Sequence, residues 1–390
     1  MRRDWRVIVV GLGGLGSGAV YWLARRLGSD VLGLEQFALG HPNGASQDHS
    51  RIIRYSYHTP AYVRLAFGAY DAWRAVEAEA NETLIVRTGG LDLWPSGAAI
   101  PMADYRASLA AVGVPFETMD GGEVMRRWPA FRLDDGTQAI FQADGGLVAA
   151  ARGTAAHQRL ARHHGATLLD RRPVTAILPA ADGSVAVELA DGERLHAQDV
   201  VLATDAWTAD LLAPLGLDLP LTVTQEQMTY FACPDPAAFA PERFPVWIWM
   251  DDPSFYGFPV FGEAGPKVGQ DVGGRIVTPA TRDFAPDAAA SARVEAFLAA
   301  HLPAALGPAI LTRTCLYTLT PDRDFVLDRL PEAPRVTVML GAAHAFKFAS
   351  HLGRIAAELV ADGRTDADLA PFAIDRPILR EAHPPTNFMV

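Results

Sequence analysis

A glycine-rich turn near the N-terminus constrains this chain more than any other feature. Residues 6–10 form a β-branched run that predicts a short strand, and GLGGLG follows at 11–16 before an apolar helix to about residue 27. Glycines at Gly11, Gly13, Gly14 and Gly16 let backbone N–H groups approach a pyrophosphate at a helix N-terminus, where the helix dipole favours negative charge. The segment therefore predicts a dinucleotide site.

An acidic residue stands where such a site needs one. A second strand is predicted at 31–34 and ends in Glu35, which lies 19 residues beyond Gly16. This is close to the spacing at which an acid meets the ribose hydroxyls of a bound dinucleotide. Strand, turn, helix, strand and acid together favour a functional site over a turn that is glycine-rich for packing alone.

The same N-terminal segment resembles a secretory signal peptide, because a charged start precedes an apolar run. Glycines interrupt that run, and Arg25 and Arg26 close it without a small-residue cleavage site. No other stretch reaches the roughly 18 apolar residues that a membrane span needs. Two cysteines cannot build a disulfide framework in 390 residues. We therefore expect no membrane association and a reducing, cytoplasmic location.

The charge balance limits the partners. The chain carries 34 basic and 45 acidic side chains, a net charge of −11, and an acidic surface argues against nucleic acid as a partner. A small anionic substrate remains compatible, because a site can be locally positive in a negative protein. The histidines show no zinc-ligand spacing with cysteine or acidic partners, so we expect no metal.

Further along the chain, elements typical of a nucleotide-binding fold recur among strand-rich segments. Pro60 opens a predicted helix, and an antiparallel meander with Asp-Gly turns at 182–183 and 191–192 precedes a buried strand that starts at residue 200. Other helices are predicted at about 148–164, 288–301 and 350–362, and other strands at 311–319, 325–327 and 336–340. The nucleotide-type segments are spread over the sequence, so the domains are expected to be discontinuous.

Six motifs, taken together, carry a family resemblance over nearly the whole chain. They are GLGGLG with Glu35, GASQDHSRIIR (44–54), VVLATDAW (200–207), FYGFPVFGEAGPKVG (255–269), TCLYTLTPDRDFVLD (314–328) and GAAHAFKFASHLG (341–353). The chain resembles the monomeric sarcosine oxidase and N-methyltryptophan oxidase family of FAD-dependent amine oxidases. The resemblance implies oxidation of a secondary amine or N-methyl amino acid to an imine, with O2 reduced to H2O2, in a monomer.

The fold that follows is mixed α/β. We expect a discontinuous Rossmann-like FAD-binding domain, formed by 1–90, 148–218 and 315–390, and a substrate domain with a mixed or antiparallel sheet, formed by 91–147 and 219–314. The cofactor-binding residues are expected to be Gly11, Gly13, Gly14, Gly16, Glu35, Gln36, Ser46, Ser50, Arg51, Val174, Cys315, Gly341, Phe346 and Lys347.

Cys315 and four basic residues carry the expected chemistry. The resemblance implies that Cys315 is bonded to the 8α-methyl of the flavin. Such a bond requires a thiolate, and nearby cations are expected to lower the pKa of the thiol. Cys233 lacks this sequence context and is expected to be inert. By the same resemblance Arg51 lies against the flavin, Arg54 and Lys347 hold the substrate carboxylate, and Lys267 promotes the reaction with oxygen.

Several positions have two readings or depart from the family. Tyr256 and Tyr317 are family pocket positions, or packed aromatics. Arg51 and Arg54, three apart in an extended segment, are predicted to point to opposite faces. Gln47 and Asp271 stand where sarcosine-type members have histidines, and Asp271 is predicted to pair with a second cationic group of the substrate or with Lys267.

Three further departures complete the set. Glu226 replaces a basic residue of many relatives. Asp205 replaces a glycine, most simply as a helix N-cap. Trp247 and Trp249 share one side of a strand, which is either an aromatic pocket or, more simply, core. These changes put sarcosine itself in doubt as substrate.

Three other functions fit parts of the sequence. An NAD(P)-dependent dehydrogenase would use the same N-terminal motif, but it gives no role to the segment around Cys315. A flavin amine dehydrogenase would pass its electrons to an acceptor other than oxygen, which Lys267 disfavours. A flavoprotein without catalysis would have little reason to keep Arg54, Lys267, Cys315 and Lys347 together.

Overall fold

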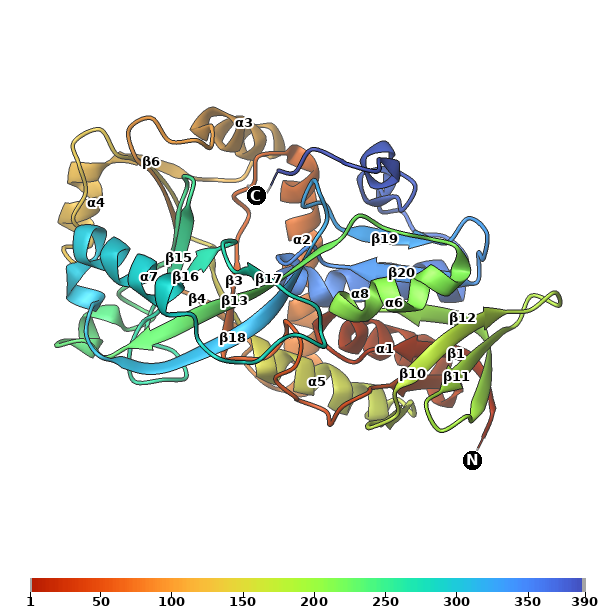
Figure 1. Ribbon diagram of the computed structural model, residues 1–390. Coiled ribbons are helices and arrows are strands. Elements are labelled where there is room, and N and C mark those ends of the chain that lie inside the picture. The colour runs from red at the N-terminus through yellow and green to blue at the C-terminus, as the bar shows by residue number, and fades with distance from the viewer. Residues whose placement is uncertain (1, 388–390) are drawn as a thin grey trace.

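Two large sheets and one small sheet organise the computed structural model, which describes residues 2–387 (Figure 1). In the first sheet β1 lies between β2 and β12, and both neighbours run parallel to it. β9 and β20 extend this parallel core on either side, as expected of a Rossmann-like unit. The strands of the first sheet are β1 (Asp4–Val10), β2 (Val31–Leu34), β9 (Thr167–Leu169), β10 (Val174–Pro179), β11 (Val185–Leu189), β12 (Arg194–Leu202), β19 (Val326–Arg329) and β20 (Val336–Leu340).

The second sheet is mixed and mostly antiparallel. β13 and β18 pair along most of their length and cross the middle of the molecule in Figure 1, whereas β14 and β5 pair in parallel. Its strands are β5 (Gly90–Trp94), β6 (Glu117–Asp120), β7 (Gln138–Gln142), β13 (Thr222–Phe231), β14 (Val246–Trp249), β15 (Ser254–Phe258), β16 (Lys267–Asp271), β17 (Arg275–Ile276) and β18 (Ala309–Leu319). The predicted mixed α/β class is confirmed.

A third, three-stranded sheet joins segments from the first half of the chain. It consists of β3 (Ser50–Ile53), β8 (Gly146–Ala149) and β4 (Ile85–Arg87). The α-helices are α1 (Gly14–Leu27), α2 (Pro60–Ala80), α3 (Met102–Val112), α4 (Gly121–Arg127), α5 (Ala150–His163), α6 (Thr208–Leu212), α7 (Ala288–His301) and α8 (Ala349–Ala357). None of the helices in residues 2–387 combines the length and apolar character that a membrane crossing demands.

The division into two domains stays a proposal. The first sheet draws on the segments assigned to FAD binding, and the second sheet draws mainly on the other two segments. The proposed boundary before residue 315 falls inside β18, which is continuous from Ala309 to Leu319. Cys315 therefore lies on a strand of the second sheet.

Local sequence signals set several helix ends. Thr59 caps α2 by accepting a hydrogen bond from the N–H of Tyr62, and Pro60 follows at the first helical position, as predicted. Asp287 caps α7 by accepting from the N–H groups of Ala289 and Ala290. The closing helix differs from the prediction: α8 ends at Ala357 and continues as a π-helical turn, η7 (Glu358–Asp362), before Gly363 stops it in the left-handed region.

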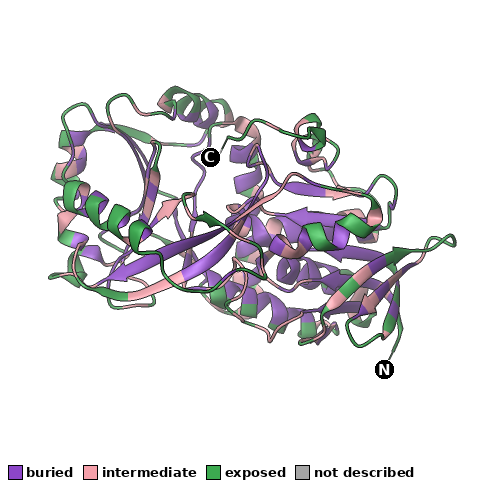
Figure 2. Ribbon diagram, in the orientation of Figure 1, coloured by how far each residue is buried: buried purple, intermediate pink, exposed green. Residues whose placement is uncertain are grey.

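The core lies on both faces of the first sheet and beneath the second sheet (Figure 2). Trp247 and Trp249 are both buried, and the Trp247 ring stacks on Phe297 of α7 with 5.6 Å between centroids. The core reading of these tryptophans is confirmed, and replacing Trp247 by alanine is expected to cost about 3–5 kcal/mol.

Candidate active site

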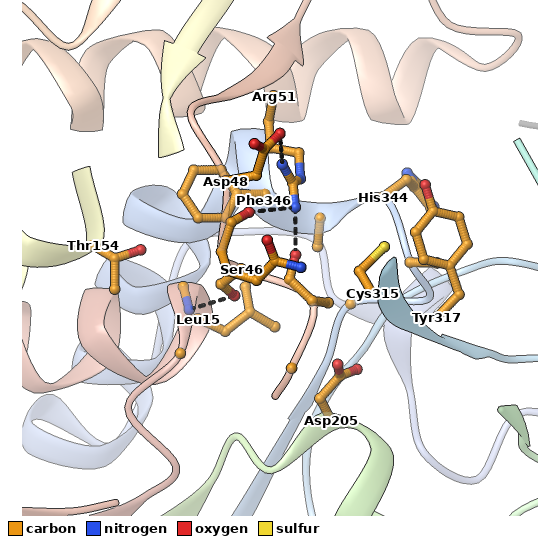
Figure 3. Close-up of a pocket in the computed structure, with 18 of the residues that line it drawn as sticks. Leu15, Ser46, Asp48, Arg51, Thr154, Asp205, Cys315, Tyr317, His344 and Phe346 are labelled. Atoms are coloured by element: carbon orange, nitrogen blue, oxygen red, sulfur yellow. Dashed lines mark hydrogen bonds and ion pairs between the residues drawn. The ribbon is translucent and has the colours of Figure 1, made fainter. Parts of the chain in front are cut away.

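One cavity of about 1060 Å³ lies where the two large sheets meet. This volume is at the upper end of the range of roughly 300–1,000 Å³ that small-ligand pockets cover. Its wall includes the glycine turn, the loop before β3, residues of β15, β16 and β18, and the segment that precedes α8. Figure 3 shows side chains from the glycine turn, the loop before β3, β18 and the segment before α8 around one space.

The glycine turn forms one end of the cavity. Gly11 has φ +87°, and a Cβ there would lie 2.5 Å from the carbonyl oxygen of Ala203. A Cβ on Gly14 would lie 2.8 Å from the Phe346 ring, and the N–H of Gly14 donates to Ser46 Oγ at 2.8 Å. The glycines therefore let the start of α1 pack closely against Ala203 and Phe346 at this end of the cavity.

Two predicted cofactor residues do not line the cavity. A Cβ on Gly16 would lie 1.8 Å from the carbonyl oxygen of Gly11, so this glycine permits close packing between the turn and α1. Ser50 contributes its backbone oxygen to Lys267. The others, Gly11, Gly13, Gly14, Glu35, Gln36, Ser46, Arg51, Val174, Cys315, Gly341, Phe346 and Lys347, all line the cavity.

Hydrogen bonds to the glycine turn and to the following loop hold the Glu35 carboxylate in place. Its Oε2 accepts from the N–H of Leu12 at 2.9 Å, and its Oε1 accepts from the N–H of Phe37 at 3.1 Å. Burial opposes ionisation, but His41 at 3.1 Å and these two N–H groups lower the pKa of Glu35. A buried, ionised carboxylate therefore faces the cavity, as an acceptor for ribose hydroxyls requires.

Arg51 is locked into the loop that precedes it. Its guanidinium donates to the backbone oxygens of Ala45, Gln47 and Ser50 at 2.6–2.8 Å. Arg54 also lines the cavity, but it pairs with Asp92 and not with the loop that holds Arg51. β3 ends at Ile53, so Arg54 lies just beyond the strand, and the prediction that the two arginines point to opposite faces stays a prediction.

Arg54 and Lys347 line the same cavity, but each has a partner already. Arg54 Nη1 donates to Asp92 Oδ1 at 3.1 Å, and both side chains are buried. Lys347 Nζ donates to the backbone oxygen of His344 at 3.0 Å. Burial, together with the charge of Arg54, holds the pKa of Lys347 well below its usual range. An incoming anion would reverse part of that shift.

Lys267 is paired with Asp48 rather than with Asp271. Its Nζ donates to Asp48 Oδ2 at 2.9 Å and to the backbone oxygen of Ser50 at 2.8 Å. Burial lowers the pKa of Lys267 to about 8 although Asp48 opposes that shift. The predicted pairing of Asp271 with Lys267 is wrong, because Asp271 Oδ2 lies 3.4 Å from Arg323 Nη2.

Cys315 lines the cavity but is only 1% exposed. Burial raises the pKa of its thiol to about 12, although the charges of Arg51 and Arg282 oppose the shift. The expected cations are present and do lower this pKa, but desolvation outweighs them, so the net shift is upward. Cys233 is partly exposed and does not line the cavity.

Three further predicted residues line the cavity, Tyr256, Tyr317 and Gln47, whereas Glu226 lies outside the lining. Tyr256 and Tyr317 both line the cavity, and burial raises the pKa of both phenols. Gln47 Nε2 donates to the backbone oxygen of Thr314 at 2.9 Å and thereby ties the loop before β3 to the strand that carries Cys315. Glu226 lies opposite Cys315 in the pairing of β13 with β18, and burial raises the pKa of Glu226 to about 7.

Asp205 does not serve as a helix N-cap. It is the first residue of the 3₁₀ turn η2 (Asp205–Trp207), whose cap is Thr204, and it makes no capping hydrogen bond. The structure places Asp205 on the cavity wall with φ +46° (Figure 3). Burial raises the pKa of its carboxyl to about 6.

Sequence reasoning missed three partners of the predicted residues: Asp48, Asp92 and Arg323. Asp92 had a readable signal, because it interrupts an apolar strand between Leu91 and Leu93. Asp48 lies three residues before Arg51, a spacing that does not single it out. Arg323 follows Pro321 and Asp322, where an exposed turn is the ordinary expectation.

The chemistry of the wall fits a dinucleotide cofactor. Several cavity-lining residues have a buried polar atom without a hydrogen-bond partner in the described structure: Gln47 Oε1, Thr154 Oγ1, Asp205 Oδ2 and His344 Nδ1. Such atoms are costly unless a ligand or water satisfies them. Together with the cradle at Gly14 and the acid at Glu35, they suit a ligand with phosphates and many hydroxyls.

The chain belongs to the FAD dependent oxidoreductase family, whose model matches residues 6–359. It is an FAD-dependent enzyme, and the prediction of FAD is confirmed, whereas the nicotinamide alternative has no support.

Among similar proteins, monomeric sarcosine oxidase of Arthrobacter sp. (strain TE1826) is 30% identical over 98% of both chains. N-methyl-L-tryptophan oxidase of Escherichia coli (strain K12 / DH10B) is 30% identical over 95% of this chain and 98% of its own. The solved open form of NikD, an amino acid oxidase essential for nikkomycin biosynthesis, superposes with a TM-score of 0.85 at 28% identity and covers 98% of this chain and 100% of its own. The predicted family resemblance is confirmed.

Proposed function

We propose that this chain is an FAD-dependent oxidase of a secondary amine or N-methyl amino acid, which converts a C–N bond to an imine and reduces O2 to H2O2. One observation carries the proposal: a single cavity joins the glycine turn, Cys315 and four basic side chains, Arg51, Arg54, Lys267 and Lys347. The names of the similar sarcosine and N-methyltryptophan oxidases support the substrate class.

Arg54 and Lys347 are the proposed carboxylate-binding pair. Asp92 offsets part of the charge of Arg54, and burial lowers the pKa of Lys347, so a bound carboxylate would supply the negative charge that this pair lacks. When the carboxylate binds, it stabilises the ammonium of Lys347 and strengthens its own site. Two donors on one anion also fix the orientation of the neighbouring α-carbon.

FAD, when bound, accepts a hydride equivalent from the substrate C–H and delivers two electrons to O2. The residues of this chain position the substrate and stabilise charge. A neutral substrate amine needs no strong general base. His344 on the cavity wall is neutral as well, because burial and the charge of Lys347 hold the pKa of its imidazole well below the usual value. Lys267 supplies the fixed positive charge that favours oxygen reduction.

Cys315 is the proposed attachment point for FAD. Attachment would replace the S–H bond of Cys315 and one C–H bond of the flavin 8α-methyl by a C–S bond, and the two electrons released would pass to O2. The thiol must lose its proton first, and the charges of Arg51 and Arg282 both favour the thiolate. Glu226, opposite Cys315, has a pKa raised to about 7 and is a candidate acceptor for that proton.

Asp271 and Gln47 make sarcosine a less suitable substrate than an amine with a larger or cationic side chain. Asp271 lines the cavity beside Arg323 and leaves a carboxylate oxygen near the proposed substrate position. A monomeric state and a cytoplasmic location belong to this proposal as well.

The test is a screen of secondary amines and N-methyl amino acids for peroxide release under air, with reduction of the flavin spectrum followed without oxygen. The oxidase proposal predicts rapid bleaching by one substrate class and peroxide in equal amount to imine. Bleaching that only artificial acceptors reverse would instead indicate an amine dehydrogenase. A yellow protein that no amine bleaches would contradict both.

A further inference from the structure

Asp48 lies at the centre of a buried cluster of charged side chains and has no role in the reaction proposed above. Its side chain is shielded from solvent, and Oδ2 accepts a hydrogen bond from Lys267 Nζ at 2.9 Å. Its Oδ1 accepts from the Tyr230 hydroxyl at 2.8 Å. Arg51 Nη1 is 3.7 Å from Oδ2, a contact that is drawn in Figure 3. Arg313 Nε lies 3.9 Å from Oδ1, so one carboxylate contacts three of the cations that line the cavity.

The backbone around Asp48 is specialised for this contact. Asp48 has φ +87°, a left-handed conformation that aspartate adopts only at a cost. Its carbonyl oxygen accepts from the N–H of Ala151 at 3.1 Å, and the neighbouring carbonyl of Gln47 accepts from Arg51. The loop is thus held from both sides in a shape that turns the carboxylate towards β16.

Lys267 depends on that carboxylate for its charge. The Lys267 side chain is almost fully buried, and its Nζ lies 3.9 Å from the centroid of the Phe258 ring. A buried ammonium is unstable unless a counter-charge and acceptors replace water. Asp48 is the carboxylate that forms an ion pair with Lys267 within residues 2–387. Burial opposes its ionisation, yet Lys267 and Arg51 lower the pKa of Asp48 to about 2.

The other titratable groups around this pair come from three elements. They are Arg51 on β3, Tyr230 on β13, and Arg313 and Cys315 on β18. Burial and the positive charge of Arg51 work against protonation of Lys267. Tyr230 keeps its proton because burial and Asp48 raise its pKa. The counter-charge of Asp48 is therefore what allows two cations to remain together.

We propose that Asp48 is a positioning residue that keeps the Lys267 ammonium charged and aimed into the cavity for the reaction with oxygen. This inference rests on the proposed oxidase function and on the role of Lys267 in it. In that step O2 takes two electrons from the reduced cofactor and two protons from the site and solvent to give H2O2. Negative charge develops on oxygen first, and a fixed ammonium favours it.

The test compares the two half-reactions of the holoenzyme by stopped flow over a range of pH. In Asp48→Asn the rate of reoxidation by O2 is expected to fall at least about tenfold near neutral pH, whereas anaerobic reduction by the substrate changes little. In the wild-type enzyme reoxidation should slow as pH rises past the pKa of Lys267, and in Asp48→Asn that midpoint should move to lower pH. Asp71→Asn, which removes an exposed carboxylate on α2, is the matched control.

A double-mutant comparison separates this inference from the proposed function. If Lys267→Met slows reoxidation and Asp48→Asn adds nothing in that background, Asp48 acts through Lys267. If Lys267→Met slows reoxidation but Asp48→Asn retains the wild-type rate and midpoint, the inference is wrong and the oxidase proposal stands. If Lys267→Met leaves reoxidation unchanged, the role of Lys267 and this inference fall together.

Two further measurements do not depend on turnover. In urea unfolding, the loss of stability in the double variant should be clearly smaller than the sum of the two single losses, because each single variant leaves one buried charge unpaired. Should Asp48→Asn not fold, Tyr230→Phe removes one hydrogen bond to Asp48 without changing any charge. Reoxidation should then slow at least about twofold with unchanged reduction, and an unaltered reoxidation rate in Tyr230→Phe would overturn the inference.

Discussion

The buried guanidinium of Arg54 donates a hydrogen bond to Asp92 Oδ1 at 3.1 Å, and this ion pair joins two sheets. Arg54 follows β3 of the small sheet, whereas Asp92 lies on β5 of the second large sheet. Both side chains are about 5% exposed, so neither charge has water to replace its partner. The pair therefore fixes one wall of the cavity at the place proposed for the substrate carboxylate.

Removing Asp92 should expose how far the fold depends on this pair. Asp92→Ala leaves the Arg54 charge buried without its carboxylate, and breaking a buried ion pair on one side typically costs about 3–5 kcal/mol. We expect a loss of that size in urea unfolding. Arg74→Ala, which breaks an exposed ion pair on α2, should cost less than about 1 kcal/mol. Equal effects of the two variants would contradict the structural role.

Cys315→Ala should abolish the covalent attachment of FAD without abolishing binding. The glycine turn and Glu35 lie apart from Cys315 on the cavity wall, so they should still hold the cofactor. After acid precipitation the yellow colour is expected in the pellet for the wild-type protein and in the supernatant for the variant. Cys233→Ala, at a partly exposed cysteine outside the cavity, should behave like the wild type. Colour that stays in the pellet with Cys315→Ala would point to another attachment residue.

The part of this fold that the sequence predicts is the part set by local patterns. The glycines at 11–16, the alternating meander and the capped starts of α2 and α7 depend on residues close together in the chain. Cys315, Lys267 and Lys347 were located by motif, and the structure brings all three to one cavity.

What local patterns cannot give is the partner of each charge. Asp48 meets Lys267 across 219 positions, and Arg54 meets Asp92 across 38. These contacts depend on how the sheets pack, and so does the desolvation that raises the pKa of Cys315. Sequence alone therefore predicts which groups matter here, but not their protonation.

Asp271→Asn should change which substrates bind. At present the carboxylate offsets the buried charge of Arg323, with Oδ2 at 3.4 Å from Nη2. The amide removes that negative charge, so the Michaelis constant of an amine with a second cationic group is expected to rise about tenfold, an energy of about 1.4 kcal/mol. For a simple N-methyl amino acid the Michaelis constant should fall, or stay within about threefold of the wild-type value. Steady-state peroxide release with both substrates gives the comparison, and equal changes for both would rule out a selective role for Asp271.

Asp205→Asn should stabilise the protein at neutral pH and have little effect in acid. Burial raises the pKa of this carboxyl from 3.8 to about 6 in the folded chain, so the folded state resists its ionisation. Between about pH 4 and about pH 6 the carboxyl ionises in the unfolded chain but stays protonated in the folded chain. The free energy of unfolding of the wild-type protein therefore falls as pH rises through this range.

The amide cannot ionise, and asparagine tolerates the left-handed backbone at φ +46°. The gain in unfolding free energy over the wild type is therefore expected to grow by about 2 kcal/mol between about pH 4 and about pH 7. Urea unfolding at the two pH values measures it, with Asp210→Asn, which removes an exposed carboxylate, as the control. A gain that is the same at both pH values would mean that Asp205 is not the ionising group, because only a charge that appears with rising pH can produce the difference.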